Sequence, residues 1–414
     1  MSIPICIFED EKYRNFLPLT YFRPVYDLKS GIFSILEKIE KYYDSKNVIL
    51  HSRKYLQNIL KEERKEYLVN DFTAEKILFI NGRLLPSGKI SELIPLEGND
   101  EIFLSNNKIV AARLSSKNYN KIIISNNDTF LDFSKLDCKK TEVDTYLFDY
   151  PWHLIQKNGE EIGNDIKLMS LKPVQNKIEG VHFLNRDSIF INDNVTIKPN
   201  VVLDAEDGPI FIDEGVKILS GTYISGPVCI GRNSLVKANT QIYHDTTIGP
   251  VCKVGGEIEN SIIHSYSNKQ HEGFLGHAYL GSWVNIGASS NNSDLKNDYG
   301  KIKVLLNGEE VDTGTNFMGL IMGDHSKCAI NTMFNTGTIV GVSCNVYGSN
   351  FPPRFIPSFS WGGADRLREY HLRKAIEVAK IVKSRRNKNM TTADLEVFKK
   401  VFELTQKERD NIKN

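Results

Sequence analysis

The sequence predicts a Rossmann-like α/β domain, followed by a parallel β-helix and by a C-terminal helical appendage. Three observations carry this prediction: short apolar runs near the N-terminus, aliphatic residues repeated every six positions in the middle, and helical spacing near the end. We expect the domains to span 1–175, 176–360 and 361–414, because 414 residues exceed the usual size of a single domain.

The N-terminal region alternates short apolar runs with amphipathic stretches at 32–43 and 53–65. This alternation is typical of strands and helices in an α/β sheet domain. The predicted strands are 3–8, 47–50, 76–80, 101–104 and 121–124. We expect the segment 144–172 to connect this domain to the next one.

Aliphatic residues then recur at six-residue intervals. A helix repeats its buried face every 3.6 residues and a strand every two, so this spacing indicates short strands separated by corners. Three such strands, roughly 18 residues, complete one coil of a parallel β-helix, in which equivalent side chains stack inside the prism. The repeated residues are Ile191, Ile197, Ile212, Ile218, Ile224, Ile230, Val236, Ile242, Ile248 and Val254, and later Phe274, Leu280, Ile286, Met322, Cys328, Phe334, Val340 and Val346.

Two interruptions break the repeat: a three-residue slip at 204–209 and a polar excursion at 289–315. A β-helix accepts insertions at its corners, where they project outward. The Asn and Lys content of the excursion favours a loop that covers an anionic ligand, and a plain surface loop is the alternative.

The C-terminal region predicts two helices. Apolar residues have helical spacing across 364–387, and a second helix begins near Thr391 or Thr392 with acidic residues in its first turn. We interpret both helices as packing or oligomer-supporting elements.

Composition excludes several classes of protein. The 52 basic and 51 acidic residues nearly cancel, so no global field attracts nucleic acid or an acidic membrane. No apolar stretch is long enough to span a bilayer and no signal peptide is visible, so a cytoplasmic protein is expected. The six cysteines are dispersed without a C-x-x-C pair, which indicates core residues in a reducing compartment rather than disulfides or a zinc site.

The residues that point to chemistry lie in 267–288, which contains Gly276-His277-Ala278-Tyr279-Leu280-Gly281 and Val284-Asn285-Ile286-Gly287-Ala288. Together with Asn297-Asp298-Tyr299-Gly300, this region resembles the acetyltransferase half of GlmU, the bifunctional enzyme that makes UDP-N-acetylglucosamine. The whole chain more closely resembles the alternative bacterial GlmU-like family of sugar nucleotidyltransferases. The shared stretches include 268–281, 291–296, 322–327, 351–358 and 361–363.

The resemblance implies a left-handed β-helix that transfers an acetyl group from acetyl-CoA to an amino sugar phosphate. It implies that His277 is the general base, a role for which an imidazole is suited near neutral pH. Tyr279 and Asn285 match positions that contact the amino sugar, and Asn297 matches one that places the acetyl group. It also implies a homotrimer, in which the CoA site lies between subunits. For the sugar phosphate the expected cations are Lys269 with Lys301 or Lys303.

Two alternatives to a general base remain for His277. One is a hydrogen-bonded structural residue, and the other is a metal site like that of the trimeric γ-class carbonic anhydrases. The side chains available for such a metal are His264, His271, His277 and His325, although their spacing does not match that family.

The N-terminal motif 17–24 resembles the L-x-P-L-T-x-x-R-P stretch of sugar-phosphate nucleotidyltransferases. It implies that Thr20, Arg23 and Asn81 bind a nucleotide, with Arg23 stabilising the departing pyrophosphate and Mg²⁺ accompanying UTP. The Gly-rich phosphate loop is absent from the position where it is expected, and Arg83 replaces the metal-binding aspartate of that family. The carboxylates left as possible metal ligands are those of Asp10, Asp27 and Asp149.

The sequence therefore predicts an enzyme of sugar-nucleotide synthesis, which N-acetylates a glucosamine-1-phosphate type substrate and couples it to uridylyl transfer. Its small-molecule partners would be an amino sugar phosphate, a CoA thioester and a nucleoside triphosphate. One alternative is a nucleotidyltransferase whose β-helix is structural only. Another is a non-catalytic scaffold that binds a sugar nucleotide.

Overall fold

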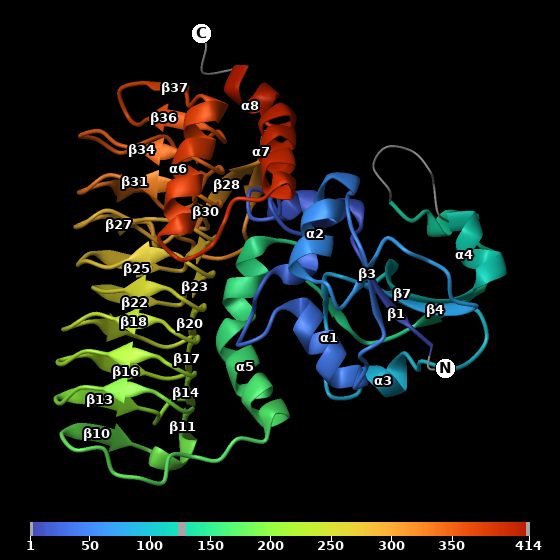
Figure 1. Cartoon of the computed structure of the whole chain (residues 1–414), viewed down its shortest axis with the longest axis horizontal. Helices are drawn as coiled ribbons and strands as arrows, with labels where there is room; N and C mark the ends of the chain where they lie inside the picture. Colours follow the sequence, from blue (N-terminus) through green and yellow to red (C-terminus); the bar gives the residue numbers. More distant parts are fainter. Residues whose placement is uncertain (1–2, 123–129, 411–414) are drawn as a thin grey trace.

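The computed structural model describes residues 3–122 and 130–410. A tall stack of short strands lies beside a smaller α/β domain, with helix α5 (Pro151–Met169) between the two (Figure 1). Helices α6 (Leu372–Ser384), α7 (Thr392–Leu404) and α8 (Gln406–Asp410) lie at one end of the stack.

The α/β domain has a seven-stranded sheet in the order β3-β2-β1-β4-β7-β6-β8. Strand β1 is parallel to β2 and β4, whereas β7 is antiparallel to β4 and β6. Its strands are β1 (Ile5–Phe8), β2 (Val48–His51), β3 (Leu68–Val69), β4 (Lys76–Asn81), β6 (Glu101–Ser105), β7 (Lys108–Ser115) and β8 (Lys139–Glu142), and a separate pair is β5 (Leu84–Leu85) with β9 (Tyr146–Leu147). The helices are α1 (Ile35–Tyr43), α2 (Gln57–Glu63), α3 (Ile90–Leu93) and α4 (Ser116–Ile122).

Four of the five predicted strands coincide with β1, β2, β4 and β6, but the strand expected at 121–124 is wrong. Residues 121 and 122 end helix α4, and 123–124 lie outside the described residues. Tyr119 and Ile122 are both buried, three positions apart on one helical face. A short apolar run alone cannot distinguish a strand from the end of such a helix.

The stack of strands is the parallel β-helix that the six-residue spacing predicts, with the left-handed sense that the resemblance implies, and it has three faces. The first face contains β10 (Val181–Leu184), β13 (Val201–Asp204), β16 (Tyr223–Ser225), β19 (Gln241–Ile242), β22 (Glu257–Glu259) and β25 (Phe274–Gly276), and β27 (Asn291–Asn292) pairs with β32 (Met333–Phe334). The second contains β11 (Ile189–Ile191), β14 (Ile210–Ile212), β17 (Val228–Ile230), β20 (Thr246–Ile248), β23 (Ile262–Ile263), β26 (Tyr279–Leu280), β30 (Leu320–Met322), β33 (Thr338–Val340) and β35 (Phe355–Ile356). The third contains β12 (Thr196–Ile197), β15 (Lys217–Ile218), β18 (Leu235–Val236), β21 (Lys253–Val254) and β24 (Asn268–Lys269), then β31 (Lys327–Cys328), β34 (Asn345–Val346), β36 (Ser360–Gly362) and β37 (Leu367–Glu369).

Most of the predicted repeat lines the interior of the prism. The eight residues from Ile212 to Val254 are fully buried there, whereas Ile191 and Ile197 are only partly buried, in the first coil. At Phe274 the prediction is wrong by one position, because Leu275 is the residue that points inward. The coil between Val254 and Leu280 is shorter than 18 residues on each face, and this shifts the register.

The corners of the prism use left-handed backbone. Asn194, Asn200, Asn233, Asn239 and Asp245 have φ between 50° and 62°, and Gly215 and Gly221 lie at equivalent corners. Gly adopts this region freely because it has no Cβ, and Asn and Asp adopt it because their short polar side chains hydrogen-bond locally. At one corner, successive coils place other residue types in this region: Val251, Tyr266, Trp283, His325, Ser343 and Phe359.

Lys269 occupies one of the inward positions, in register with Val254. Its side chain is 2% exposed, and its Nζ donates to the carbonyl oxygens of Gly255 at 2.9 Å and His271 at 2.7 Å. Burial lowers the pKa of Lys269 from 10.5 to about 8. The ammonium group therefore lies inside the prism.

Replacing Lys269 by methionine is expected to change stability in a pH-dependent way. The folded-state pKa is depressed, so between about pH 8 and 10.5 the unfolded chain binds more protons and the wild type gains stability as pH rises. Relative to Lys269→Met, the wild type should gain on the order of 2 kcal/mol between pH 7 and pH 10. Urea unfolding at both pH values measures this, with the exposed Lys217→Met as control. An equal stability difference at the two pH values would contradict it.

Helix α5 holds the α/β domain against the second face of the β-helix. Asn158 donates from Nδ2 to the carbonyl oxygen of Asp245 at 2.8 Å and accepts from Thr247 Oγ1 at 3.1 Å. A Cβ on Gly159 would lie 1.5 Å from Asp245 Oδ1, so glycine is required for this close approach. Lys38 on α1 forms buried ion pairs with Glu161 and Asp165 of α5. These contacts hold α5 between the α/β domain and the β-helix.

The polar excursion is ordered. It contains the hairpin β28 (Lys303–Leu306) and β29 (Glu309–Asp312), and Ile302, Val304 and Leu306 are buried in the same hydrophobic cluster as the α/β domain. Asn307 donates from Nδ2 to the carbonyl oxygen of Arg14 at 3.0 Å. The excursion therefore joins the β-helix to the N-terminal part.

The C-terminal helices partly match the prediction. The first helix starts at Leu372 instead of near Ala364, because Leu367–Glu369 forms strand β37 against β36. Thr391 and Asp394 form the capping box expected at the second helix. All six cysteines are free thiols, and five of them are buried. Within residues 3–122 and 130–410, no helix is long and apolar enough to cross a bilayer.

Candidate active site

His277 follows β25 at the corner between the first and second faces, and its φ is 44°. This corner carries a histidine ring in a backbone conformation that elsewhere in the prism is mostly taken by Asn, Asp or Gly. A Cβ on Gly276 would lie 2.4 Å from Phe274 Cζ and 2.5 Å from Asp294 Oδ2, so a larger residue here would displace these two side chains. The backbone here therefore brings Asp294 close to the imidazole.

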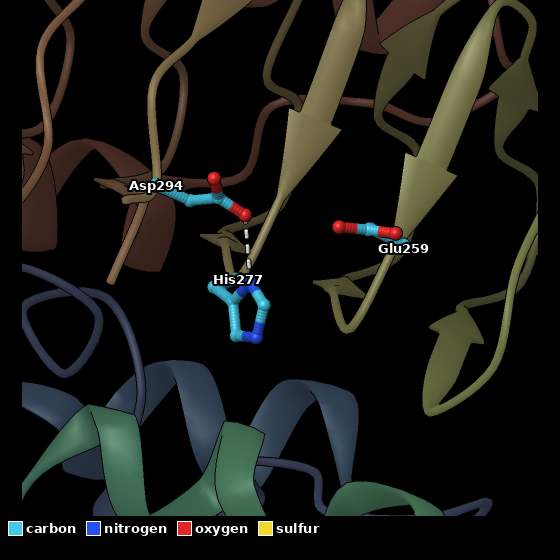
Figure 2. Close-up of side chains that lie close together, drawn as sticks. All are labelled: Glu259, His277 and Asp294. Atoms are coloured by element: carbon cyan, nitrogen blue, oxygen red, sulfur yellow. Dashed lines mark hydrogen bonds and ion pairs between the residues drawn. The ribbon is translucent and has the colours of Figure 1, made fainter. Parts of the chain in front are cut away.

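His277 Nδ1 lies 2.7 Å from Asp294 Oδ2, and both side chains are less than one-fifth exposed. A carboxylate accepts a hydrogen bond, so Nδ1 carries the proton between them, and in the neutral ring Nε2 has the lone pair. Figure 2 shows Asp294 facing one ring nitrogen, while the other nitrogen points toward the helices of the N-terminal part. This is the arrangement of a base oriented by a carboxylate.

A cavity of about 230 Å³ lies beside the ring of His277. The ring of Phe317 stacks on His277 with a centroid distance of 4.9 Å and an interplanar angle of 23°. The cavity combines apolar walls with a few polar groups, which is typical of small-molecule sites. Its lining residues are Trp152, Ile155 and Gln156 of α5, Asn260, His277, Thr315, Phe317 and Met318.

Glu259 completes a group of three possible metal ligands with His277 and Asp294, whose ligand atoms lie within 4.8 Å of one another. Burial raises the pKa of Glu259, and the Asp294 carboxylate raises it further. This group differs from the predicted histidine set: among the described residues, no such group contains His264, His271 or His325. His264 instead contacts Ser265 and Ser282, and His325 is stacked on Trp283. Among the described residues of one chain, the histidines of the carbonic-anhydrase-like alternative therefore do not meet.

The remaining predicted sugar and acyl contacts do not converge on His277. Lys269 lies inside the prism, so it cannot reach a sugar phosphate from there. Tyr279 is fully buried, and its hydroxyl accepts from the backbone N–H of Lys29 at 2.9 Å, between the two parts of the chain. Asn285 lies on the third face near Asn268. The exposed side chains of the excursion, Asn297, Lys301 and Lys303, are not among the described residues that line the cavity.

Arg23, the predicted pyrophosphate ligand, binds the β-helix. Its Nη2 donates to both carboxylate oxygens of Asp324 at 2.9 and 2.8 Å and to Ser282 Oγ at 3.1 Å. Arg23 lines a cavity of about 630 Å³ where the α/β domain, the β-helix and the C-terminal helices meet. Thr20 and Asn81 lie elsewhere: Thr20 donates to the carbonyl oxygen of Tyr13 at 3.1 Å, and Asn81 donates to Asp10 at 2.9 Å. The three predicted nucleotide ligands therefore do not share one site.

The position of the missing phosphate loop is filled by an ion pair. Glu9 is 1% exposed, and it accepts from the backbone N–H of Val25 at 2.9 Å and from Arg53 Nε at 3.0 Å. The Arg53 guanidinium also donates to the carbonyl oxygens of Thr20 and Arg23. This pair holds the segment 17–24 in place with side chains.

Arg83 stands where the motif has a metal-binding aspartate, and its positive charge also stands in place of the metal ion. Its guanidinium donates to both oxygens of Asp10 at 2.9 and 2.6 Å and to Asp149 at 2.9 Å, while Lys108 also binds Asp149. Asp27, the third candidate, pairs with Arg64. The carboxylates that a divalent metal would need are already neutralised, so these residues do not fit the implied Mg²⁺.

We expect Mg²⁺ to leave the thermal unfolding temperature of the wild type unchanged and to raise that of Arg83→Ala. Removing the guanidinium breaks the ion pair of Asp10 and leaves Asp149 with Lys108 alone, and a hard dication then binds only the folded state. Thermal scans with and without millimolar Mg²⁺ test this. Arg64→Ala, which frees only Asp27, should show no such response, and a Mg²⁺-dependent rise in the wild type would refute the expectation.

Parts of the chain are similar to known proteins. Residues 5–172 match the sugar nucleotidyl transferase family. A bifunctional sugar-1-phosphate nucleotidylyltransferase/acetyltransferase of Sulfurisphaera tokodaii is 28% identical over 213 residues, which is 50% of this chain and 47% of that protein. The bifunctional protein GlmU of Methanocaldococcus jannaschii is 25% identical over 211 residues, covering 50% and 45%, and that of Synechococcus sp. strain JA-3-3Ab is 28% identical over 198 residues, covering 42% and 29%. The chain thus spans about half the length or less of these relatives.

A solved structure of UDP-N-acetylglucosamine acyltransferase from Francisella novicida covers 55% of this chain and 87% of its own, at 12% identity and a TM-score of 0.25. Residues 5–172 are thus similar to sugar nucleotidyl transferases, and a parallel β-helix follows them. Over half of its length or less, the chain is similar to the Sulfurisphaera bifunctional enzyme and to the GlmU proteins.

The sequence alone did not single out Asp294, Glu259, Phe317 or Trp152. Asp294 lies in the stretch 291–296 shared with the GlmU-like family, and that was the available signal. Trp152 comes from the other domain, and only the packing of α5 brings it to the β-helix.

Proposed function

We propose that this chain transfers an acyl group from a CoA thioester to the amine of an amino sugar 1-phosphate, with acetyl-CoA and a glucosamine-1-phosphate type acceptor. The observation that carries the proposal is the His277–Asp294 pair, whose free ring nitrogen faces the 230 Å³ cavity. Similarity to a protein named as a bifunctional sugar-1-phosphate nucleotidylyltransferase/acetyltransferase supports the choice of reaction.

In the proposed reaction, Nε2 of His277 accepts a proton as the substrate nitrogen attacks the thioester carbonyl carbon. The C–N bond forms, the C–S bond breaks, and the imidazolium returns its proton to the departing CoA sulfur. Asp294 stabilises the imidazolium and fixes the ring, a positioning role, because it touches Nδ1 and not the reacting atoms.

The cavity walls fit this chemistry. Phe317 and Trp152 reduce access of water to the imidazole, which strengthens its interaction with Asp294. Gln156, Asn260 and Thr315 offer amide and hydroxyl groups for sugar hydroxyls. For the phosphate we propose the exposed Lys301 and Lys303, which lie on the excursion that leads to the cavity.

Uridylyl transfer from UTP, giving UDP-N-acetylglucosamine or a similar sugar nucleotide, is the second half of the proposal. The family match over residues 5–172 supports it. Because Arg83 pairs with Asp10 and Asp149, this step would use no metal at those carboxylates. Asn81, which also binds Asp10, would then lie beside the guanidinium rather than beside an ion. A cytoplasmic homotrimer with domains near 1–175, 176–360 and 361–414 completes the proposal.

The test is release of thiol from acetyl-CoA in the presence of glucosamine-1-phosphate, run beside release of pyrophosphate from UTP and N-acetylglucosamine-1-phosphate. Thiol release supports the proposal. Pyrophosphate release alone would replace it with a nucleotidyltransferase whose β-helix is structural. Binding of UDP-N-acetylglucosamine with neither product would identify a scaffold instead. Light scattering of the same sample gives the mass of the assembly.

A further inference from the structure

A second cavity, of about 360 Å³, lies on the third face of the β-helix, where the end of helix α6 covers it. It shares no lining residue with the cavity beside His277 among the described residues. The β-helix contributes Lys253, Tyr266, Asn268, Gln270, Trp283, Asn285 and Lys327, and the end of α6 contributes Val382, Arg385 and Arg386. It is therefore a separate site at another corner of the prism.

Four cations meet at this cavity. Lys253 and Lys327 come from strands of the third face, and Arg385 and Arg386 come from the last turn of α6 and just beyond it. Among the described residues that line the cavity none is Asp or Glu, and no salt bridge of the described chain contains any of these four. Their charge is left without a carboxylate to balance it.

The surroundings make this charge unfavourable in the absence of an anion. Burial lowers the pKa of Lys327 to about 8, and burial together with Arg386 and Arg385 lowers that of Lys253. Arginines near a helix C-terminus interact favourably with the helix dipole, and this interaction accounts for the positions of Arg385 and Arg386. It does not account for the two lysines, which the β-helix aims at the same space. An anion in the cavity would balance all four.

Polar side chains lie between the two lysines, and hydrogen bonds hold them in place. Asn268 and Asn285 lie in neighbouring coils between Lys253 and Lys327, in one outward column of the third face. The Oδ1 of Asn268 accepts from Arg386 Nη2 at 2.9 Å, which fixes the guanidinium and leaves its other N–H groups to donate. Asn285, predicted as a sugar contact, thus lines this cavity and not that of His277.

An aromatic wall borders the cations. The rings of Tyr266 and Trp283 stack with a centroid distance of 4.2 Å and an interplanar angle of 7°, and His325 continues the stack beyond Trp283. All three residues have φ of 62° or 63°, in the left-handed region that ring-bearing residues rarely adopt. Val251 and Phe359 take the same conformation at this corner in other coils, so the backbone alone does not mark a site. Tyr266 and His325 cover the two faces of Trp283, and a planar base joined to phosphates would contact the edge of this stack beside the cations.

We propose that this cavity binds a nucleoside diphosphate, with the phosphates among Lys253, Lys327 and Arg386 and the base along the edge of the Tyr266–Trp283 stack. The diphosphate could be that of a uridine nucleotide or the adenosine diphosphate portion of a larger ligand, and both present the same chemistry. The proposal goes beyond acyl transfer at His277 and does not depend on it.

Calorimetric titration of the full chain with pyrophosphate, UDP and ADP tests the proposal. Pyrophosphate should bind, and at least one nucleoside diphosphate should bind more tightly. Lys327→Gln and Arg386→Gln should each weaken all three by more than about tenfold, because each removes a charged hydrogen bond. Trp283→Leu should weaken the nucleotides and leave pyrophosphate unchanged. The tighter of UDP and ADP then identifies the base.

The matched control is Lys217→Gln, which removes an exposed lysine from the same outward column two coils away. It should leave all affinities unchanged. Absence of binding to the folded wild type would overturn the proposal, and so would equal affinities in the wild type and the two charge variants. Nucleotide affinity that survives Trp283→Leu would overturn the placement of the base. Comparing thermal scans of each variant with the wild type ensures that lost affinity does not reflect unfolding.

Discussion

Replacing His277 by alanine is expected to lower the rate of acetyl transfer by about 10²- to 10⁴-fold, the usual contribution of a general base. The loss should fall on kcat, because the imidazole accepts its proton in the transition state and adds little to substrate binding. Thiol release with acetyl-CoA and glucosamine-1-phosphate measures both parameters. The thermal unfolding temperature should change little, because the side chain borders a cavity.

Two further variants make this result specific. Asp294→Asn keeps the size of the side chain but removes the carboxylate that fixes the tautomer of His277, so kcat should fall and its pH profile should shift. His271→Ala removes an exposed histidine outside the cavity and should leave the rate unchanged. Activity that survives His277→Ala would rule out the proposed base, whatever Asp294→Asn does.

Replacing Asp324 by alanine is expected to lower the free energy of unfolding by about 3–5 kcal/mol, the usual cost of breaking a buried ion pair from one side. Asp324 is 1% exposed and pairs with Arg23 across the contact between the α/β domain and the β-helix. The substitution leaves a guanidinium facing the β-helix without its carboxylate. Ser282, whose backbone N–H donates to Asp324, loses a partner too.

Chemical denaturation followed by circular dichroism measures this loss. The double variant Arg23→Met with Asp324→Ala should recover part of it, because no unpaired charge is left behind. Lys303→Ala, which breaks an exposed ion pair with Glu310, serves as the control and should not change the unfolding midpoint. If the double variant is no more stable than Asp324→Ala, the cost does not come from the unpaired guanidinium.

The candidate site was only partly predictable from the sequence. His277 was singled out by its motif, and its place on a corner beside a cavity follows from the six-residue repeat and the fold. Lys269 was misassigned because the coil containing it is shortened, which turns this lysine inward, in register with Val254. Arg23 was assigned to a nucleotide because sequence similarity gives no information about Asp324, which lies 301 positions away.

By itself the sequence determined the β-helix, the strands β1, β2, β4 and β6, the capping box of α7, and the similarity to the GlmU-like family. Each of these depends on spacing or on contiguous motifs, which are local properties of the chain. The tertiary structure decided the partners: Asp294 for His277, Asp10 and Asp149 for Arg83, and α5 as the wall of the cavity. Such pairs come from distant positions or from different domains, because burial and charge act between side chains that only folding brings together.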